Sequence, residues 1–374
     1  MHSIVVFVES LIAPHQQVLA GIEFHRAQHN LEWSVAVMTQ GRLLSQVTNN
    51  TFYLTIHSRL IPESLNDSAV VAQRPILGLF GSSSQHYHPC ISLQEQAFGD
   101  LAAHHFADLG LRHIAYIPSA RSQSQAHFTA YYQGLREACS AMGMSVEELP
   151  PGSADGDMAL CAALHQHSKP LGIYCATDAQ AAWLLERCTE EGLRVPEEVA
   201  ILGTSDHPHH CQRRRPALSS IAFPWFLMGR ALGQAVHRQI SGVARPETQI
   251  LRPLRVIERE SSAGLLPTDP LIAASLAWLK RHVQESQPLV ACAAAQGCSV
   301  PTLSRRFRKV LGSSVKQVHA RVRHRQAMHL LASSNKSIAA VAEACGYADA
   351  AALSVAFKRQ SGWSPGRWRL AARS

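Results

Sequence analysis

Apolar positions in the first 260 residues follow two alternating patterns. Short apolar or β-branched runs predict strands at 3–8, 33–38, 75–80, 113–118, 171–177, 199–204 and 218–223. Between several of them, apolar residues recur three and four positions apart, which predicts helices at 16–28, 96–110, 130–143 and 178–192. Nearly continuous apolar strands between helices are typical of parallel sheets covered on both faces. The pattern predicts an α/β fold with two doubly wound lobes and a ligand cleft between them.

Strand signals stop after Glu258–Pro270, a polar stretch that contains Gly and Pro and that we interpret as the linker region. All later segments have helical periodicity: 271–283, 288–297, 299–312, 315–333, 337–348 and 349–362. The sequence therefore predicts an α/β domain over 1–260, a linker over 261–270 and an all-α module over 271–374.

The predicted helical module contains an internal repeat. Leu289–Phe307 and Ile338–Phe357 start 49 positions apart, and Gly297 and Gly346 each stand eight residues into their copy. Each copy reads as a short Ala-rich helix, a glycine turn and a longer second helix. The residues expected to cap the second helices are Ser299 and Asp349. This pattern predicts two helix-turn-helix motifs.

The charge distribution indicates what such motifs would bind. Residues 265–374 hold 16 Lys and Arg against 4 Asp and Glu, a balance of +12, whereas residues 1–264 have a balance of −4. A basic module on a mildly acidic body favours a polyanion partner. Because the second helix of a helix-turn-helix enters the major groove, double-stranded DNA is the expected partner.

The two second helices predict different roles in reading DNA. In the first copy Leu303 and Phe307 form the inward stripe, and Arg305 can pair bidentately with guanine. The other expected contacts of this helix are Pro301, Thr302, Ser304 and Arg308, with Arg306 and Lys309 suited to phosphates. The second copy offers at its outward positions Ala350, Ala351, Ala352, Ser354 and Val355, followed by Lys358 and Arg359. We expect the first helix to supply most base discrimination, and the helix 315–333 to set the two about one duplex turn apart, ~34 Å.

Other chemistry has weak support in the sequence. There is no GxGxxG, Walker, GxSxG or HExxH motif. His207–Cys211 carries metal-ligand residue types, but adjacent loop residues rarely all face one ion, so a polar loop is the alternative reading, as it is for His86 and His88. Nine cysteines without a CxxC pair favour a reducing compartment. The N-terminus has no cationic start, and no apolar run is long enough to span a bilayer, so we expect a cytoplasmic location. Because no cofactor-binding motif is present, we also expect no cofactor.

Two stretches carry a family resemblance. "SRRFRKVLGSSV" and "SIAAVAEACGY…FKRQSGWSPGRWR" closely resemble AraC/XylS-type transcription regulators. "GDLAAHHFADLGLRHIAYI", "CATDAQAAWLLERCTEEGLRVPEEVAILGTSD" and "PALSSIAF" resemble the type I periplasmic-binding-protein-like domain of LacI/GalR-type repressors. The resemblance implies a homodimeric activator of a carbohydrate operon, a pentose such as xylose being the leading case. It further implies a small-molecule effector in the inter-lobe cleft and RNA polymerase as a partner.

The resemblance also implies effector-binding positions, and this sequence departs from the pattern at several of them. Tyr131 stands where such receptors usually have a sugar-binding Arg, Gln94 and Ser205 stand where Asp is usual, and Asp178 matches. The full set of effector candidates is Glu9, Gln94, Tyr131, Asp178, Ser205 and Asp206. An altered sugar, a non-sugar effector, or an effector-free domain that serves as a dimerisation scaffold or belongs to a constitutive DNA binder therefore stay open. A further alternative is an enzyme that uses Asp178, Ser205, Asp206 and His207, although we expect no catalysis.

Overall fold

The computed structural model describes residues 2–8, 12–39, 50–57, 75–80, 86–119, 125–151, 157–243, 245–265, 267 and 269–372. Two compact units divide the chain, the first built from Met1–Gln94 and Pro224–Leu251 and the second from Glu95–Phe223 and Arg252–Arg373. Glu9, one of the expected effector contacts, lies outside the described residues. Along the described residues, no helix is both long enough and apolar enough to cross a membrane.

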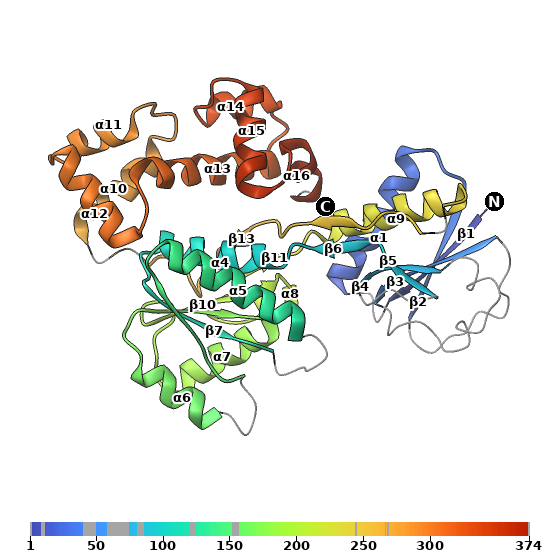
Figure 1. The fold of residues 1–374 in the computed structure, drawn as a ribbon, viewed down its shortest axis with the longest axis horizontal. Helices are drawn as coiled ribbons and strands as arrows, with labels where there is room; N and C mark the ends of the chain where they lie inside the picture. Colours follow the sequence, from blue (N-terminus) through green and yellow to red (C-terminus); the bar gives the residue numbers. More distant parts are fainter. Residues whose placement is uncertain are drawn as a thin grey trace. The chain divides into compact units, whose positions relative to one another are not determined.

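The first unit is built on a parallel sheet of order β2-β1-β3-β4-β5 (Figure 1). Its strands are β1 (His2–Val8), β2 (Trp33–Thr39), β3 (Thr51–His57), β4 (Ile76–Phe80) and β5 (Tyr87–Pro89). Helices α1 (Ala13–Gln28) and α9 (Trp225–Ile240) pack against each other. A small parallel pair, β6 (Ile91–Leu93) with β12 (Gln249–Leu251), completes the unit.

The second unit contains a six-stranded sheet of order β13-β11-β10-β9-β7-β8. Its strands are β7 (His113–Ile117), β8 (Ser145–Glu148), β9 (Leu171–Cys175), β10 (Val199–Ser205), β11 (Ser219–Ala222) and β13 (Val256–Ile257). The strands pair in parallel except β13, which runs antiparallel to β11. The helices between them are α4 (Gln96–Asp108), α5 (Gln125–Ala141), α6 (Asp157–Gln166), α7 (Asp178–Glu190) and α8 (Pro208–Cys211). Apolar faces of the strands and of α7 form its core.

The helical module, drawn in orange and red in Figure 1, belongs to this second unit. Its helices are α10 (Pro270–Arg281), α11 (Pro288–Ala295), α12 (Val300–Leu311), α13 (Val315–Ser333), α14 (Ile338–Ala344), α15 (Ala350–Ser361) and α16 (Pro365–Ala372). The long helix α13 serves both halves. Val315 and Val318 join the core around Phe307, and the later part of α13 contacts α14, α15 and α16.

The predicted fold class is confirmed, since parallel-sheet α/β architecture is followed by an all-helical module. All seven predicted strands are present. The structure contains further elements that the sequence pattern did not predict, namely β3, β5, β6, β8, β12, β13, α6, α8, α9 and α16. The stretch interpreted as a linker begins as part of the α/β domain, because Ser261 and Ser262 are fully buried. The Ser261 backbone N–H donates to Ala217, and its hydroxyl donates to the carbonyl of Ile201 in β10.

Candidate functional site

Both helix-turn-helix copies turn on a glycine with left-handed backbone. Gly297 has φ of 63°, and the N–H of the residue after it donates to the Ala293 carbonyl over 3.0 Å. Gly346 has φ of 72°, and the N–H of the residue after it donates to the Ala342 carbonyl over 2.9 Å. This pair of features is the Schellman ending of a helix. The two predicted turns are therefore the same structure built twice.

The second helix of each copy begins at its predicted cap. Ser299 Oγ accepts a hydrogen bond from the Thr302 N–H over 3.3 Å at the start of α12. Asp349 Oδ1 accepts one from the Ala352 N–H over 2.7 Å at the start of α15. The predicted inward stripe of the first copy is confirmed, because Leu303 and Phe307 are fully buried. Leu353 and Phe357 are fully buried in the second copy too. Equivalent faces of α12 and α15 are thus turned outward.

The outward face of α12 is cationic. Pro301, Arg305, Arg306, Arg308 and Lys309 are exposed, and Thr302 and Ser304 are half-buried. Arg306, expected to contact phosphate, pairs with Asp269, the N-cap of α10, over 3.2 Å. Within the described part of the chain, the side chains of Arg305 and Arg308 make no hydrogen bond or ion pair. These two guanidinium groups therefore keep all their donors for an external acceptor.

The outward face of α15 is largely apolar. Val355 is 70% exposed, and Ala351 is exposed beside it. The Ser354 hydroxyl donates to the Ala350 carbonyl of its own helix over 2.8 Å, so its proton is already engaged. The exposed cations Lys358 and Arg359 stand in the last turn of the helix. The structure thus keeps the chemical asymmetry that the sequence predicts, on two matching frames.

A buried ion pair joins the α/β domain to helix α13. Asp108, the last residue of α4, accepts from Arg321 over 2.8 Å and also pairs with Arg325. Burial disfavours the charge of Asp108, yet the guanidinium groups of Arg325 and Arg321 hold the pKa of this carboxyl below its usual range. Sequence reasoning missed this contact, since the partners stand more than two hundred positions apart. The sequence signal for this contact is limited to three arginines at alternate positions of one predicted helix, Arg321, Arg323 and Arg325.

Tyr131 of α5 lies in an aromatic cluster near the start of α4. Its ring stacks on Phe98 of α4, with centroids 4.9 Å apart, and lies 6.4 Å from Tyr174 of β9. Phe223 also packs on Phe98, with ring centroids 5.0 Å apart. Tyr131 is only 5% exposed, and burial raises the pKa of its phenol. The residue that replaces the expected Arg thus packs inward as an aromatic.

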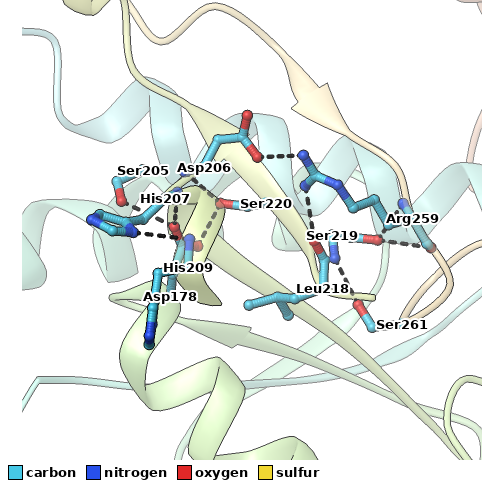
Figure 2. A network of polar contacts seen from close by, with 10 residues as sticks. All are labelled: Asp178, Ser205, Asp206, His207, His209, Leu218, Ser219, Ser220, Arg259 and Ser261. Atoms are coloured by element: carbon cyan, nitrogen blue, oxygen red, sulfur yellow. Dashed lines mark hydrogen bonds and ion pairs between the residues drawn. The ribbon is translucent and has the colours of Figure 1, made fainter. Parts of the chain in front are cut away.

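Asp178, the first residue of α7, is the centre of a buried polar network (Figure 2). One carboxylate oxygen accepts from Ser205 Oγ (3.0 Å) and from the His207 N–H (2.7 Å), and the other from Ser220 Oγ (2.6 Å). The residue is 2% exposed, and burial raises its pKa to about 6. Both oxygens of Asp178 are therefore occupied by groups of the same chain.

Within this network, Ser205 and Asp206 have an unusual backbone conformation. At the carboxyl end of β10 their φ angles are 110° and 56°, positive values that residues with a side chain rarely adopt. The Asp206 N–H donates to Ser220 Oγ over 3.0 Å, and its carboxylate pairs with Arg259 over 2.7 Å, as Figure 2 shows. Burial raises the pKa of Asp206. Strained backbone held by such a network is typical of ligand-binding turns.

The structure brings Asp178, Ser205 and Asp206 together in the second unit, whereas Gln94 is an exposed residue of the first unit. The structure also describes the histidines that the sequence offered either as metal ligands or as parts of polar loops. His88 contacts the Pro246 carbonyl over 2.7 Å, and the rings of His207, His209 and His210 lie 5.1 to 6.4 Å apart. No group of three or more possible ligands is placed to hold a metal ion in the described ranges.

Comparisons with known proteins address this architecture directly. A family described as "Periplasmic binding protein-like domain" matches residues 103–262, and one described as "Helix-turn-helix domain" matches residues 292–371. The "Xylose operon regulatory protein" of Escherichia coli is 23% identical over 98% of this chain and 97% of its own length. The chain is a homologue of the xylose operon regulators. It is an AraC-type DNA-binding regulator with a periplasmic-binding-protein-like domain.

Further relatives cover parts of this regulator. The "HTH-type transcriptional activator RhaS" of Escherichia fergusonii is 32% identical over 34% of this chain and 46% of its own length. Among solved structures, that of the "xylose-binding transcription activator xylR" has a TM-score of 0.58 at 22% identity and covers 100% of this chain and 99% of its own. A LacI family regulator from Enterococcus faecium with bound ribose has a TM-score of 0.52 at 22% identity, covering 70% of this chain and 99% of its own. These structural matches agree with the fold.

Proposed function

We propose that this regulator activates a carbohydrate operon under the control of a small-molecule effector, with α12 reading most of the base sequence. The observation that carries the proposal is the pair of matching helix-turn-helix frames with chemically different outward faces, next to a domain whose sheet edge holds a strained polar turn. The names of the homologous xylose operon regulators and of the activator RhaS support the carbohydrate class and activation.

On DNA, Arg305 and Arg308 are the proposed base-reading or groove-edge residues of α12, with Thr302 and Ser304 beside them. Lys309 then contacts phosphate. The second helix docks through Ala350, Ala351 and Ser354, with Lys358 and Arg359 on the backbone. An arginine can distinguish guanine through two hydrogen bonds, whereas an alanine offers only methyl contact. Arg306 takes part only after it releases Asp269.

For the effector, we propose a site in the second unit at the carboxyl edge of the six-stranded sheet, with Tyr131, Ser205 and Asp206 as contacts. Gln94 and Glu9 stay candidates on the family resemblance alone. Ligands of such sheets bind beyond the carboxyl ends of the strands. Asp178 serves as the residue that holds the turn, because both of its carboxylate oxygens already accept hydrogen bonds from Ser205, His207 or Ser220. Our first candidate is a sugar, in particular a pentose, that stacks a C–H face against the half-buried ring of Phe223, because Phe98, Tyr131 and Tyr174 are buried.

One observation favours a second candidate, an effector-free receptor domain that serves as a dimerisation scaffold. The only matched ligand position, Asp178, is 2% exposed, and Tyr131 is 5% exposed, so both side chains are used for packing. In either case we propose a homodimer that recruits RNA polymerase, acts in the cytoplasm where its nine free cysteines stay reduced, and carries no catalysis.

Helix α4 is the proposed connection between effector and DNA. It spans 13 residues, about 20 Å of helix, with Phe98 in the aromatic cluster near one end and Asp108 clamped by Arg321 and Arg325 at the other. An effector that shifts Phe98 would move α13, which carries both helix-turn-helix copies. Such coupling requires the ligand to bind one arrangement better than the other.

The test is a thermal-shift screen of the full chain against pentoses, hexoses, polyols and their acids, followed by DNA-site selection with and without any hit. A ligand at 100 times its Kd stabilises the protein by ~2.7 kcal/mol. We expect a neutral sugar to raise the melting temperature and Phe98→Ala to abolish the shift. Specific DNA binding without any hit would instead support the effector-free scaffold.

A further inference from the structure

A pocket of about 480 Å³ lies within the second unit, between α4, residues 252–258, α13 and the end of α15. This volume suits a metabolite-sized molecule. Five arginines and three carboxylates line it, an excess of two positive charges. The arginines are Arg252, Arg255, Arg321, Arg325 and Arg359, and the carboxylates are those of Asp100, Asp108 and Glu258.

Some of these charges already have partners. Asp108 binds Arg321 and Arg325, and Asp100 lies 3.4 Å from His104 Nδ1. Along the part of the chain that the structure describes, no hydrogen bond or ion pair reaches the guanidinium groups of the other three arginines. They are Arg252, Arg255 and Arg359. The pocket therefore gathers three sets of donors and leaves them without a bonded acceptor.

Arg255 shows most clearly why this arrangement is energetically unfavourable. Its guanidinium carbon lies 5.6 Å from the centre of the Trp368 ring, over an apolar surface, and burial lowers its pKa. A guanidinium group has five N–H donors, and a desolvated cation without a bound anion is costly. His324 adds a buried Nδ1 that has no hydrogen-bond partner within the described residues. The polar groups of this pocket thus converge on a space that fits an anion.

We propose that this pocket is a second ligand site, which takes a small molecule with an oxyanion group, phosphate or carboxylate, held by Arg252, Arg255 and Arg359. Arg252 and Arg255 lie in the segment between β12 and β13. Arg359 lies in α15, the second helix of the second helix-turn-helix copy. A bound oxyanion would tie α15 to that segment and withdraw Arg359 from DNA phosphate. The residues that line this pocket differ from those of the sheet-edge effector site, although the charge of Arg255 also interacts with that of Asp206 in the latter.

Calorimetric titration of the full chain tests the proposal, with inorganic phosphate, glucose 6-phosphate, gluconate and uncharged glucose as the probes. We expect saturable binding of at least one anionic probe and none of glucose. Equal affinity for phosphate and glucose 6-phosphate identifies free phosphate as the source, and preference for gluconate identifies a carboxylate. Bound probe should also lower DNA affinity and reduce the slope of log K against log salt by about one phosphate contact.

Variants separate the pocket from general charge effects. Arg252→Gln and Arg255→Gln should each weaken the anionic probe at least tenfold while DNA binding persists, which shows that the variants fold. Arg213→Gln, an exposed arginine of the same unit, makes the same charge change outside the pocket and should have no effect. Absence of binding by all anionic probes would overturn the proposal. So would binding that survives both pocket variants, or an equal loss in Arg213→Gln.

Discussion

The two helix-turn-helix copies have the same backbone plan and different surfaces. Gly297 and Gly346 shape equal turns, and Ser299 and Asp349 cap equal second helices. Yet α12 presents unpaired arginines, whereas α15 presents alanines and a valine that is 70% exposed. A shared frame therefore does not imply a shared task. The interior residues preserve the geometry, and the outward residues decide how each copy meets DNA.

The copies also differ in their interiors. The first is packed with aliphatic side chains around Phe307. In the second, the ring of His324 lies 4.5 Å from that of Phe357, which in turn contacts Trp368 at 5.9 Å. The first half also holds a buried histidine, His319, but its ring contacts the His282 carbonyl over 3.0 Å. Because His324 Nδ1 has no hydrogen-bond partner within the described residues, we expect the second copy to respond more strongly to acid.

The largest expected effect is acid destabilisation of the second copy. Burial lowers the pKa of His324 to about 4, so the folded state holds it neutral. Its contribution to stability is complete above the unfolded value near 6.5 and is lost as pH falls from there towards 4, a loss of ~3 kcal/mol. Hydrogen exchange resolved by segment should show α14–α16 losing protection before α11 and α12. His324→Leu should flatten that difference, and equal losses in both copies would break the comparison.

The turn glycines give the next effect. An added Cβ on Gly346 would lie 2.6 Å from Gln284 Cα, whereas one on Gly297 would meet nothing within 4 Å. Both substitutions add left-handed strain, so Gly297→Ala should lower the free energy of unfolding by ~1 kcal/mol. Gly346→Ala adds a steric clash and should lower it by roughly 2–3 kcal/mol. Denaturant titration of the two variants measures this. A larger loss for Gly297→Ala would contradict the packing account.

DNA reading should differ in the opposite sense. Arg305→Ala should reduce discrimination at one base pair by ~1–3 kcal/mol, because a bidentate contact to guanine is lost. Ser354→Ala, the matched control on α15, removes a hydroxyl already bonded to its own helix and should change specificity little. Site selection with each variant gives the comparison. Equal relaxation by both changes would show that the copies share base reading.

The caps provide the smallest test. Ser299→Ala and Asp349→Ala should each destabilise their helix by ~1 kcal/mol. The loss should be larger for Asp349, because its bond is 2.7 Å against 3.3 Å and its charge interacts favourably with the helix dipole. Thermal melts at high salt, where the dipole contribution is screened, should bring the two values together.

Sequence reasoning succeeded where structure depends on near neighbours. The predicted helix 315–333 has those bounds in the structure, and its start is secured by a capping box between Ser314 and Gln317. It failed for α9, whose Gly229 and Gly233 count against a helix. An added Cβ on Gly229 would lie 1.9 Å from the Val18 carbonyl oxygen, so glycine is needed for the close approach to α1. That reason exists only in the packed molecule.

Two kinds of information thus separate in this protein. Turns, caps, helical stripes and the surface chemistry of α12 and α15 follow from interactions within a few residues, which a sequence displays directly. Tertiary structure alone decided that both Asp178 oxygens accept hydrogen bonds and that Tyr131 packs inward. It also decided the pairing of Asp108 with Arg321 and Arg325 and the pocket that these residues share with three unpaired arginines. In each of these, residues far apart in the chain meet, and whether a polar group is free or occupied depends on which surfaces pack together.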